Sequence, residues 1–412
     1  MGPLIFISAG EASGEHYGAL LASALPQRLA PGGEAVELIG MGGSRMQAAG
    51  VECIVRAEDM AVMGVTEVLL HLPRIYRGFH SLKRAIRTRR PQVAVLIDFP
   101  DVHFRLAKEF HKLGIPVIYF VSPQLWAWKE HRIELVRQYV RRMLVIFPFE
   151  VPFYRSRGVD AEFVGHPLAD LPLPAVSRAQ FAAENGLNPD RIWIGLLPGS
   201  RLPEIENHLP EMLEAAWRLA APHPAAIPTE TFEFIIPLAP TLDATQRAAV
   251  LRLAEKHGGG LSVRLVDDAR AALFHARASV VASGTATVEA ALIGNPFVVV
   301  YRVSSLTYAI ARRAVRVPHV AMANLIAGKR VVPELIQHDF KAANIVQQLG
   351  PLLPDGPDRE SMMKELAAIR QALRSDSPVG AGQEQSAIAR VAAFVIKEIE
   401  LTCTAAMQPA QL

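Results

Sequence analysis

Carboxylate, hydroxyl and glycine residues are concentrated directly after the first apolar run of the chain. They are Gly10, Glu11, Ser13, Gly14 and Glu15. A glycine-containing loop that enters a helix lets a ligand approach the backbone, and the free N–H groups of the helix start attract negative groups. The spacing matches neither a dinucleotide fingerprint nor a Walker loop. A plain turn needs fewer polar side chains, so we expect Glu11, Ser13 and Glu15 to be functional.

Two carboxylates, Asp98 and Asp101, follow a later apolar strand, at the strand end where open α/β sheets bind ligands. Asp101 is well placed as a helix N-cap. Asp98 is the better candidate for a general base, although an aspartate there is often only a hydrogen-bonding loop residue. The next strand leads into Trp126 and Trp128, which could form one wall of a sugar or acyl site or simply pack in the core.

Two loops in the second half resemble phosphate sites. Gly199, Ser200 and Arg201 meet before a helix, which is a suitable seat for a diphosphate. Ser283, Gly284 and Thr285 precede a second helix, and Glu289 lies one turn inside it, where a carboxylate could accept from ribose hydroxyls.

No metal motif accompanies these loops: Asp-x-Asp, His-Glu-x-x-His and cysteine clusters are all absent from the sequence. We therefore expect no cofactor, with the charge of a leaving diphosphate met by arginine and helix dipoles. The two cysteines, Cys53 and Cys403, suggest a reducing compartment. The N-terminus lacks a secretory signal and no run is long enough to span a membrane.

The elements that must position these residues alternate between short β-branched runs and amphipathic segments. The 412 residues favour two domains, each with this doubly wound α/β pattern. The expected strands are 4–9, 36–40, 93–98, 117–122, 143–147 and 162–165, then 192–197, 232–238, 262–266, 279–282 and 297–302. Helices are expected at 15–29, 101–113 and 131–140, and two more, at 359–374 and 385–401, close the chain.

The proline-dense segment 167–174 predicts the linker. We expect an N-terminal domain over 1–170, a C-terminal domain over 171–355 and terminal helices over 356–412 that return to the N-terminal domain.

Basic residues gather where acidic ones are absent, which predicts anionic partners at two places. The first stretch carries Arg74, Arg77, Lys83, Arg84, Arg87, Arg89 and Arg90, and the second carries Arg302, Arg312, Arg313, Arg316, Lys329 and Arg330. Segment 60–90 combines the first group with apolar residues. It suits an anionic lipid surface, or is a helical hairpin whose apolar face is core.

Taken together, the motifs resemble those of the lipid-A-disaccharide synthase family, and they occur in the family's order over most of residues 4–340. The strings are AGEASGE (9–15), GMGGSRM (40–46), MAVMG (60–64), IDFPD (97–101), VSPQLWAW (121–128), LLPGSR (196–201), ASGTATVE (282–289) and NLIAG (324–328).

The resemblance implies the glycosyltransferase B (GT-B) fold, an α/β fold of two doubly wound Rossmann-like domains facing a cleft. The acceptor and membrane contact belong to the first domain and the UDP-sugar to the second. Such enzymes join UDP-2,3-diacylglucosamine to 2,3-diacylglucosamine 1-phosphate (lipid X) with inversion, without a metal. By motif matching, the catalytic residues are Asp98 as base, Glu11, Ser13, Arg201 and Asn324. Substrate-binding residues are Glu15, Met63, Trp126, Gly199, Ser200, Ser283, Gly284, Thr285 and Glu289.

The same resemblance implies a peripheral enzyme on the cytoplasmic face of the inner membrane of a Gram-negative-type bacterium. No nucleic acid partner is expected, and a homodimer stays open.

Three positions depart from the family pattern. Glu15 stands where the family has Asp, His16-Tyr17 follow it, and His103 replaces an Asn. His16 becomes an alternative proton acceptor. The rival hypotheses are a peptidoglycan-type glycosyltransferase, a UDP-sugar 2-epimerase and a non-catalytic UDP-binding regulator.

Overall fold

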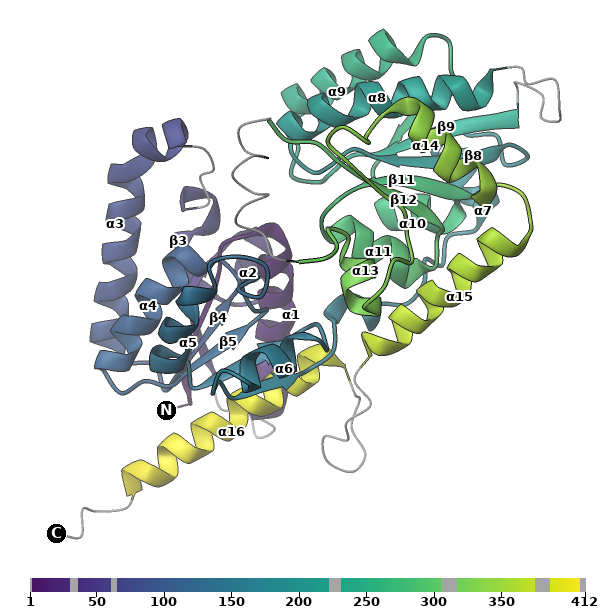
Figure 1. Ribbon diagram of the computed structural model, residues 1–412. Helices are drawn as coiled ribbons and strands as arrows, with labels where there is room; N and C mark the ends of the chain where they lie inside the picture. Colours follow the sequence, from purple (N-terminus) through teal and green to yellow (C-terminus); the bar gives the residue numbers. More distant parts are fainter. Residues whose placement is uncertain are drawn as a thin grey trace. The chain divides into compact units, whose positions relative to one another are not determined.

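The computed structural model describes residues 2–29, 36–60, 65–221, 231–304, 308, 317–374 and 386–407. The chain divides into two compact units, and each is described by itself. The N-terminal unit comprises residues 1–170 and 373–412, and the C-terminal unit comprises residues 171–372. Both are layered α/β structures with a parallel sheet at the centre (Figure 1).

The N-terminal unit contains a seven-stranded sheet in the order β3-β2-β1-β4-β5-β6-β7. Its strands are β1 (Leu4–Ala9), β2 (Glu37–Gly42), β3 (Glu52–Arg56), β4 (Val93–Ile97), β5 (Val117–Phe120), β6 (Arg142–Val145) and β7 (Ala161–Phe163). Its helices are α1 (Ala12–Leu29), α2 (Ser44–Ala48), α3 (Val65–Arg89), α4 (Pro100–Lys112), α5 (Ile133–Tyr139), α6 (Glu150–Arg155) and α16 (Ala387–Met407).

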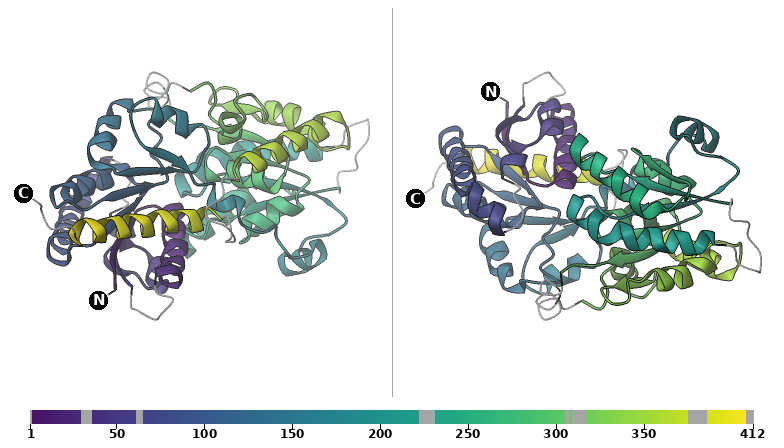
Figure 2. Two further views of the ribbon diagram at one scale, coloured as in Figure 1. Left: turned by 90° about the horizontal axis from the view of Figure 1, so that it is seen from below. Right: turned by 90° about the horizontal axis from the view of Figure 1, so that it is seen from above.

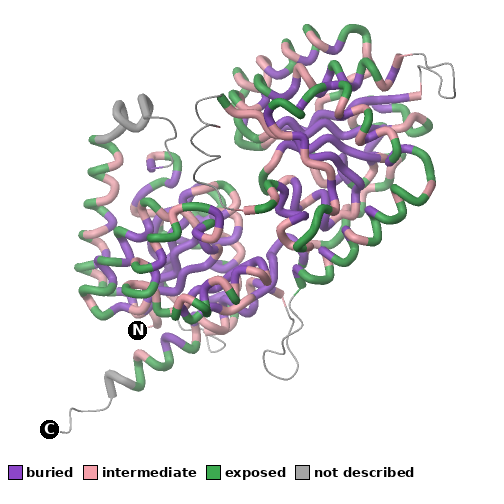
Figure 3. The backbone as a smooth tube through the Cα atoms, in the orientation of Figure 1, coloured by how far each residue is buried: buried purple, intermediate pink, exposed green. Residues whose placement is uncertain are grey.

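Both faces of this sheet are covered, which explains why its strands read as continuous apolar runs. Phe6 and Leu96 belong to the core that α3, α4 and α5 complete, with Leu82 and Phe110 on the helices. Helices α1 and α16 contact each other and β4 on the other side (Figure 2). The inner strands β1, β2, β4, β5 and β6 are almost entirely buried (Figure 3), whereas the edge strands β3 and β7 are partly exposed.

The C-terminal unit has a six-stranded sheet in the order β10-β9-β8-β11-β12-β13. Its strands are β8 (Ile192–Leu197), β9 (Phe232–Pro237), β10 (Val263–Val266), β11 (Ala278–Ala282), β12 (Phe297–Tyr301) and β13 (Glu334–Ile336). Its helices are α7 (Arg178–Asn185), α8 (Leu202–Ala220), α9 (Ala244–Gly258), α10 (Ala269–His275), α11 (Thr285–Ile293), α13 (Met322–Ala327), α14 (Ala342–Leu349) and α15 (Pro357–Ala372).

The predicted fold class, α/β with two doubly wound parallel sheets, is confirmed. Two short strands were missed, β3 and β13, because edge strands of mixed polarity show no apolar run. The hairpin alternative for segment 60–90 is wrong: residues 65–89 form one helix of 25 residues with Pro73 inside it. Of the two closing helices, α15 contacts α11 and α13, whereas α16 contacts α1.

No helix in the described part of the chain combines the length and the apolar character that crossing a membrane requires.

Candidate functional site

The strand order of the N-terminal unit reverses between β1 and β4, and two carboxylates follow these two strands. Glu11 comes after β1 and Asp98 directly after β4, and β1 and β4 are parallel neighbours. Ligands of open α/β sheets bind at such a reversal, beyond the carboxyl ends of the strands. The fold therefore brings Glu11 and Asp98, which lie far apart in the sequence, to the favoured binding edge of this sheet.

Asp98 sits in a backbone conformation that side-chain-bearing residues rarely adopt. Asp98 and Phe99 both have φ of +51°. Tyr119 Oη and His103 Nδ1 each donate to the Asp98 carbonyl oxygen over 2.6 Å, which holds this turn in place. Because α4 begins at Pro100 with Phe99 at the N-cap, the N-cap prediction for Asp101 is wrong. Asp101 instead pairs with Arg132 at 2.7 Å.

The carboxyl of Asp98 has the properties of a general base. Burial, and after it the negative charge of Glu11, raise the pKa of Asp98 to about 7, and the Phe99 backbone N–H acts in the opposite direction. A base with a pKa near the working pH combines a useful ionised fraction with proton affinity. Across the described residues, neither the Glu11 carboxylate nor the Ser13 hydroxyl makes a hydrogen bond to protein, so both are available to a ligand.

Gly10 serves packing rather than ligand approach. A Cβ at this position would lie 2.3 Å from ring atoms of Phe99. Helix α1 begins at Ala12, so Ser13 and Glu15 belong to its first turn and not to an extended loop. The close packing of Gly10 and Phe99 therefore fixes the two strand ends that carry Glu11 and Asp98.

Glu15 is engaged within the protein. Its Oε1 accepts from the Arg45 backbone N–H at 2.8 Å, at the start of α2. Burial first, and then the charge of Arg45, lower the pKa of the neighbouring His16, while Glu15 opposes this effect. A lowered pKa makes His16 a weaker proton acceptor than Asp98.

His103 is a buried structural residue. Its Nδ1 donates to the Asp98 carbonyl, so its Nε2, 2.9 Å from Ser8 Oγ, accepts from that hydroxyl. Burial lowers the pKa of His103 to about 4, so the ring is neutral at physiological pH.

The loop after β5, residues 121–128, is held by a carboxylate that the sequence reasoning missed. Trp126 Nε1 and Ser122 Oγ donate to Glu150 Oε1 over 3.0 and 2.7 Å. The indole N–H of Trp126 is thus already used by the protein, whereas Trp128 is 46% exposed. Met63 lies outside the described residues.

The C-terminal unit repeats the arrangement, since its strand order reverses between β8 and β11 and a predicted phosphate loop follows each strand. In the β8 loop (198–201), Gly199 has φ of +130°, which favours glycine. The Ser200 N–H donates to Glu204 Oε2 at 3.2 Å. The side chain of Arg201 is 52% exposed and lies 3.4 Å from Glu204, so it is accessible to a ligand at the start of α8.

His208 braces the β8 loop, and sequence analysis did not single it out. This buried ring donates from Nδ1 to the Pro198 carbonyl at 2.7 Å. Its Nε2 accepts from the Arg302 backbone N–H at 3.0 Å. It therefore ties the ends of β8 and β12 together; no sequence signal distinguishes this role from that of any other core histidine.

The β11 loop (283–285) leads into α11. Gly284 has φ of +147°, and Ser283 Oγ donates to the Val320 carbonyl at 3.5 Å. Thr285 is the first helical residue and no side chain caps this helix start, so the Thr285 and Ala286 amides are open to an anion, whereas the Thr287 N–H donates to the Gly284 carbonyl at 3.1 Å. Burial raises the pKa of Glu289, whereas Arg270 lowers it and Asp268 raises it.

Asn324 lies where it cannot offer a group to a ligand. Its side chain is completely buried, its Oδ1 accepts from the Val331 and Val332 backbones, and its Nδ2 donates to Glu334 Oε1 at 2.8 Å. Glu334 in turn accepts from the Val320 and Ala321 backbones. Asn324 therefore positions the segment that contacts Ser283.

Tertiary ion pairs neutralise much of the first basic stretch. Lys83 and Arg87 both pair with Glu109, Arg89 pairs with Glu37 and Glu52, and Arg74 pairs with Asp59. In the part of the molecule that is described, the members without an acidic partner are Arg77, Arg84 and Arg90.

Ion pairs also neutralise part of the positive charge of the second basic stretch. Arg302 pairs with Glu211, and Lys329 pairs with Glu365. Arg312, Arg313 and Arg316 lie outside the described residues.

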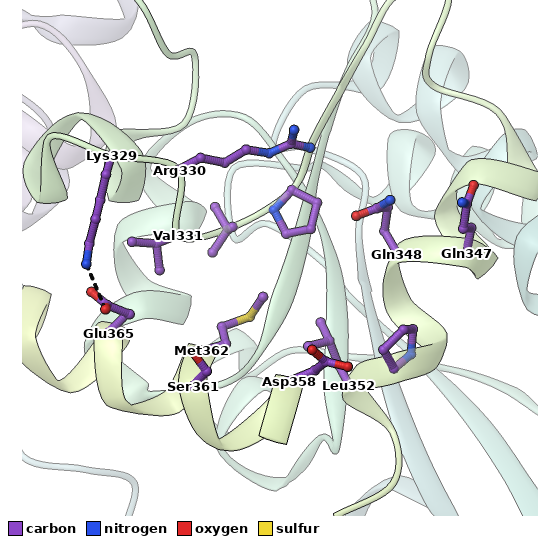
Figure 4. A pocket seen from close by; sticks show the side chains of 13 residues that line it. Lys329, Arg330, Val331, Gln347, Gln348, Leu352, Asp358, Ser361, Met362 and Glu365 are labelled. Atoms are coloured by element: carbon purple, nitrogen blue, oxygen red, sulfur yellow. Dashed lines mark hydrogen bonds and ion pairs between the residues drawn. The ribbon is translucent and has the colours of Figure 1, made fainter. Parts of the chain in front are cut away.

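A cavity of about 680 Å³ lies elsewhere on the C-terminal unit (Figure 4). The lining residues 329–333 precede β13, so it opens at the amino end of that strand. Lys329 and Glu365 form an ion pair of 2.7 Å in its wall. None of the predicted site residues lines this cavity. Over the described ranges, no group of three or more His, Cys, Asp or Glu residues could hold a metal ion.

Solved structures with this architecture include sugar-nucleotide enzymes. A putative UDP-N-acetylglucosamine 2-epimerase from Listeria monocytogenes is similar with a TM-score of 0.62 at 14% identity, covering 97% of this chain and 98% of its own. A calicheamicin glycosyltransferase is similar with a TM-score of 0.56 at 17% identity, with the same two coverages. These likenesses show the GT-B fold alone.

Sequence relatives are more specific. A lipid-A-disaccharide synthase of Acidobacterium capsulatum is 57% identical over 398 residues, covering 94% of each chain. One from Koribacter versatilis is 48% identical over 384 residues, covering 93% of this chain and 96% of its own. The family model described as lipid-A-disaccharide synthetase matches residues 5–387. The chain belongs to the lipid-A-disaccharide synthetase family.

Proposed function

We propose that this chain transfers 2,3-diacylglucosamine from UDP to the 6-hydroxyl of 2,3-diacylglucosamine 1-phosphate, giving a β-1,6-linked disaccharide 1-phosphate and UDP. The observation that carries the proposal is the pair Glu11 and Asp98 at the sheet reversal, in a chain 57% identical to a lipid-A-disaccharide synthase. Asp98 has the pKa that a base for an alcohol needs, and Glu11 and Ser13 are free to hold the acceptor.

In the proposed mechanism, Asp98 takes the proton of the acceptor hydroxyl as its oxygen attacks the anomeric carbon, and the bond to UDP breaks in the same displacement. The configuration inverts and no covalent intermediate forms. Arg201 and the backbone amides at the start of α11 stabilise the negative charge on the departing diphosphate. The N-terminal unit thus binds the acceptor and the C-terminal unit binds the nucleotide, with Gly199, Ser200, Ser283, Gly284, Thr285 and Glu289 near UDP.

A peripheral membrane role is part of the proposal, because both substrates are acylated. Helix α3 offers Arg77 and Arg84 without acidic partners among the described residues, and Tyr76, next to Arg77 in the sequence, is 65% exposed. Basic and aromatic side chains on one helix suit the surface of an anionic membrane. We infer that the enzyme works at the cytoplasmic face of the inner membrane of a Gram-negative-type bacterium.

The alternatives are not favoured. The epimerase likeness rests on 14% identity, whereas the curated relatives that are 42% to 57% identical carry the synthase name. The non-catalytic alternative predicts UDP binding without UDP release.

The deciding experiment is incubation of the pure protein with both acylated glucosamine substrates, in the presence of a chelator. Release of UDP together with a product of disaccharide mass supports the proposal. Nucleotide binding without release would support the regulator instead, and a requirement for a divalent ion would contradict the metal-independent mechanism.

A further inference from the structure

A second strained turn lies beside the turn of Asp98. Val121, the first residue after β5, has φ of +62°, which is rare for a β-branched residue. Strand β5 is the parallel neighbour of β4, and the Asp98 N–H donates to the Phe120 carbonyl at 3.0 Å. Strained residues persist only where surrounding contacts determine them, and they concentrate at functional sites. The turns at the ends of β4 and β5 are therefore joined in one hydrogen-bonded unit.

The Val121 N–H donates to the Leu144 carbonyl at 3.1 Å, and Glu150 holds the side chains that follow Val121 in this loop. The side chain of Glu150 is 1% exposed at the start of α6. Oε1 accepts from Ser122 Oγ at 2.7 Å and Trp126 Nε1 at 3.0 Å, and Oε2 accepts from the Phe147 N–H at 3.1 Å. One buried carboxylate thus joins the loops that follow β5 and β6.

No basic side chain contacts Glu150 in the described structure, so the group is not one half of an ion pair. Its surroundings are hydrogen-bond donors, together with Tyr154, whose hydroxyl donates to the Pro123 carbonyl at 3.2 Å. Burial raises the pKa of Glu150 to about 7, and the donors Ser122, Trp126 and the Phe147 backbone oppose that rise. Burying an acid without a counter-ion costs free energy, and such groups are often found at functional sites.

We propose that Glu150 is a positioning residue that fixes the loop 121–128, and through it the acceptor side of the site next to Asp98. This inference rests on the proposed function. Glu150 does not touch the substrate; it acts through Ser122 and Trp126. Several donors converge on it, and an ionised carboxylate is the side chain that accepts on both oxygens and donates from neither.

The test compares Glu150→Gln with Glu134→Gln, a matched change at an exposed position on α5. In Glu150→Gln an N–H₂ group replaces one of the two accepting oxygens. This group then faces a hydrogen-bond donor instead of accepting from it, so the loop rearranges. We expect kcat/KM for the acceptor to fall about tenfold or more, while the Kd for UDP stays within about twofold. The indole ¹H–¹⁵N resonance of Trp126, assigned with Trp126→Phe, should shift in Glu150→Gln and stay in place in Glu134→Gln.

Three outcomes would overturn the inference: acceptor kcat/KM within about twofold of the parent, an unmoved indole resonance, or equal losses in UDP and acceptor affinity. If Glu150→Gln does not fold, Ser122→Ala and Trp126→Phe decide, since each removes one donor to Glu150. We expect each to lower acceptor kcat/KM several-fold, and full activity in both would overturn the inference. The indole shift needs no turnover, so it tests the role of Glu150 even if the proposed reaction fails.

Discussion

The Nδ1 atom of His103 lies 2.6 Å from the backbone carbonyl oxygen of Asp98. Tyr119 Oη donates to the same oxygen, also over 2.6 Å. Two donors on one carbonyl hold Asp98 at a φ of +51°, with its carboxyl at the end of β4. The backbone of the proposed base is thus set by buried neutral groups, and its protonation is set by burial and by the charge of Glu11.

The pH dependence of turnover should report Asp98. The pKa of Asp98 is raised to about 7, so the carboxyl is protonated and inactive as a base below that pH and becomes competent as the pH rises through it. We expect kcat/KM for the acceptor to increase up to about pH 7 and then level. Asp98→Asn should remove this limb and lower kcat about 100-fold or more, with UDP affinity retained. Unchanged turnover in Asp98→Asn would remove Asp98 from the role of base.

The stability of the fold should decline in acid because of His103. Its pKa is lowered from 6.5 to about 4 in the folded protein. Above pH 6.5 the ring is neutral in both states; below it the unfolded chain takes up a proton that the folded chain refuses, so the free energy of unfolding falls until about pH 4.

His103→Gln should flatten the pH dependence of the free energy of unfolding by up to about 1.4 kcal/mol per pH unit. Urea unfolding at about pH 7 and about pH 5 measures this effect. His111→Gln, at an exposed position of the same helix, is the control and should leave the slope unchanged. Equal slopes for His103→Gln and the parent would mean that the buried ring does not resist protonation.

Much of the fold was predictable from sequence because buried parallel strands read as apolar runs. β1 and β8 match their predicted limits. Edge strand β13 was not predicted, because only Leu335 of its three residues is buried. The hairpin alternative for segment 60–90 was wrong, because residues 65–89 continue as the single helix α3 with Pro73 inside it.

The chemistry of the site was less predictable, because it depends on which distant side chains meet. Asp98 was identified from its place after a strand, yet its raised pKa depends on burial by the folded structure and, after that, on the charge of Glu11, which lies far from it in the sequence. Glu150 was not identified, since its donors Ser122 and Trp126 precede it by more than twenty positions. The only local signal for Glu150 was that it is the polar residue in an otherwise apolar run, Phe147 to Val151.

Nucleotide affinity should depend on Arg201. Its guanidinium is half exposed at the start of α8, where a diphosphate would find both positive charge and the helix terminus. Arg201→Ala should raise the Kd for UDP about tenfold or more, since a charge-assisted hydrogen bond is worth about 1.5–3 kcal/mol. Arg218→Ala, in the last turn of the same helix, is the matched control. Calorimetric titration with UDP gives both values, and equal constants would exclude Arg201 from the nucleotide site.

The position of the β11 loop should depend on the amide of Asn324. Asn324→Asp replaces the N–H₂ that faces Glu334 Oε1 by a second carboxylate oxygen, in a fully buried place. Repulsion should destabilise the C-terminal unit by about 2 kcal/mol or more and weaken UDP binding, because Glu334 holds Val320 against Ser283. Asn344→Asp, on the exposed side of α14, is the control. Hydrogen exchange at residues 320–334 measures the effect; protection equal to that of the parent would contradict the positioning role.

Attachment to an anionic membrane should depend on the two unpaired arginines of α3. Arg77→Glu combined with Arg84→Glu reverses charges that have no acidic partner among the described residues, so no internal ion pair is lost. Each basic residue near such a surface contributes about 1 kcal/mol, so the double variant should bind vesicles containing anionic lipid at least about tenfold more weakly, and most clearly at low salt. Arg252→Glu with Lys256→Glu on α9 makes the same change in net charge on the C-terminal unit. Equal losses in the two double variants would show that attachment follows net charge and not the surface of α3.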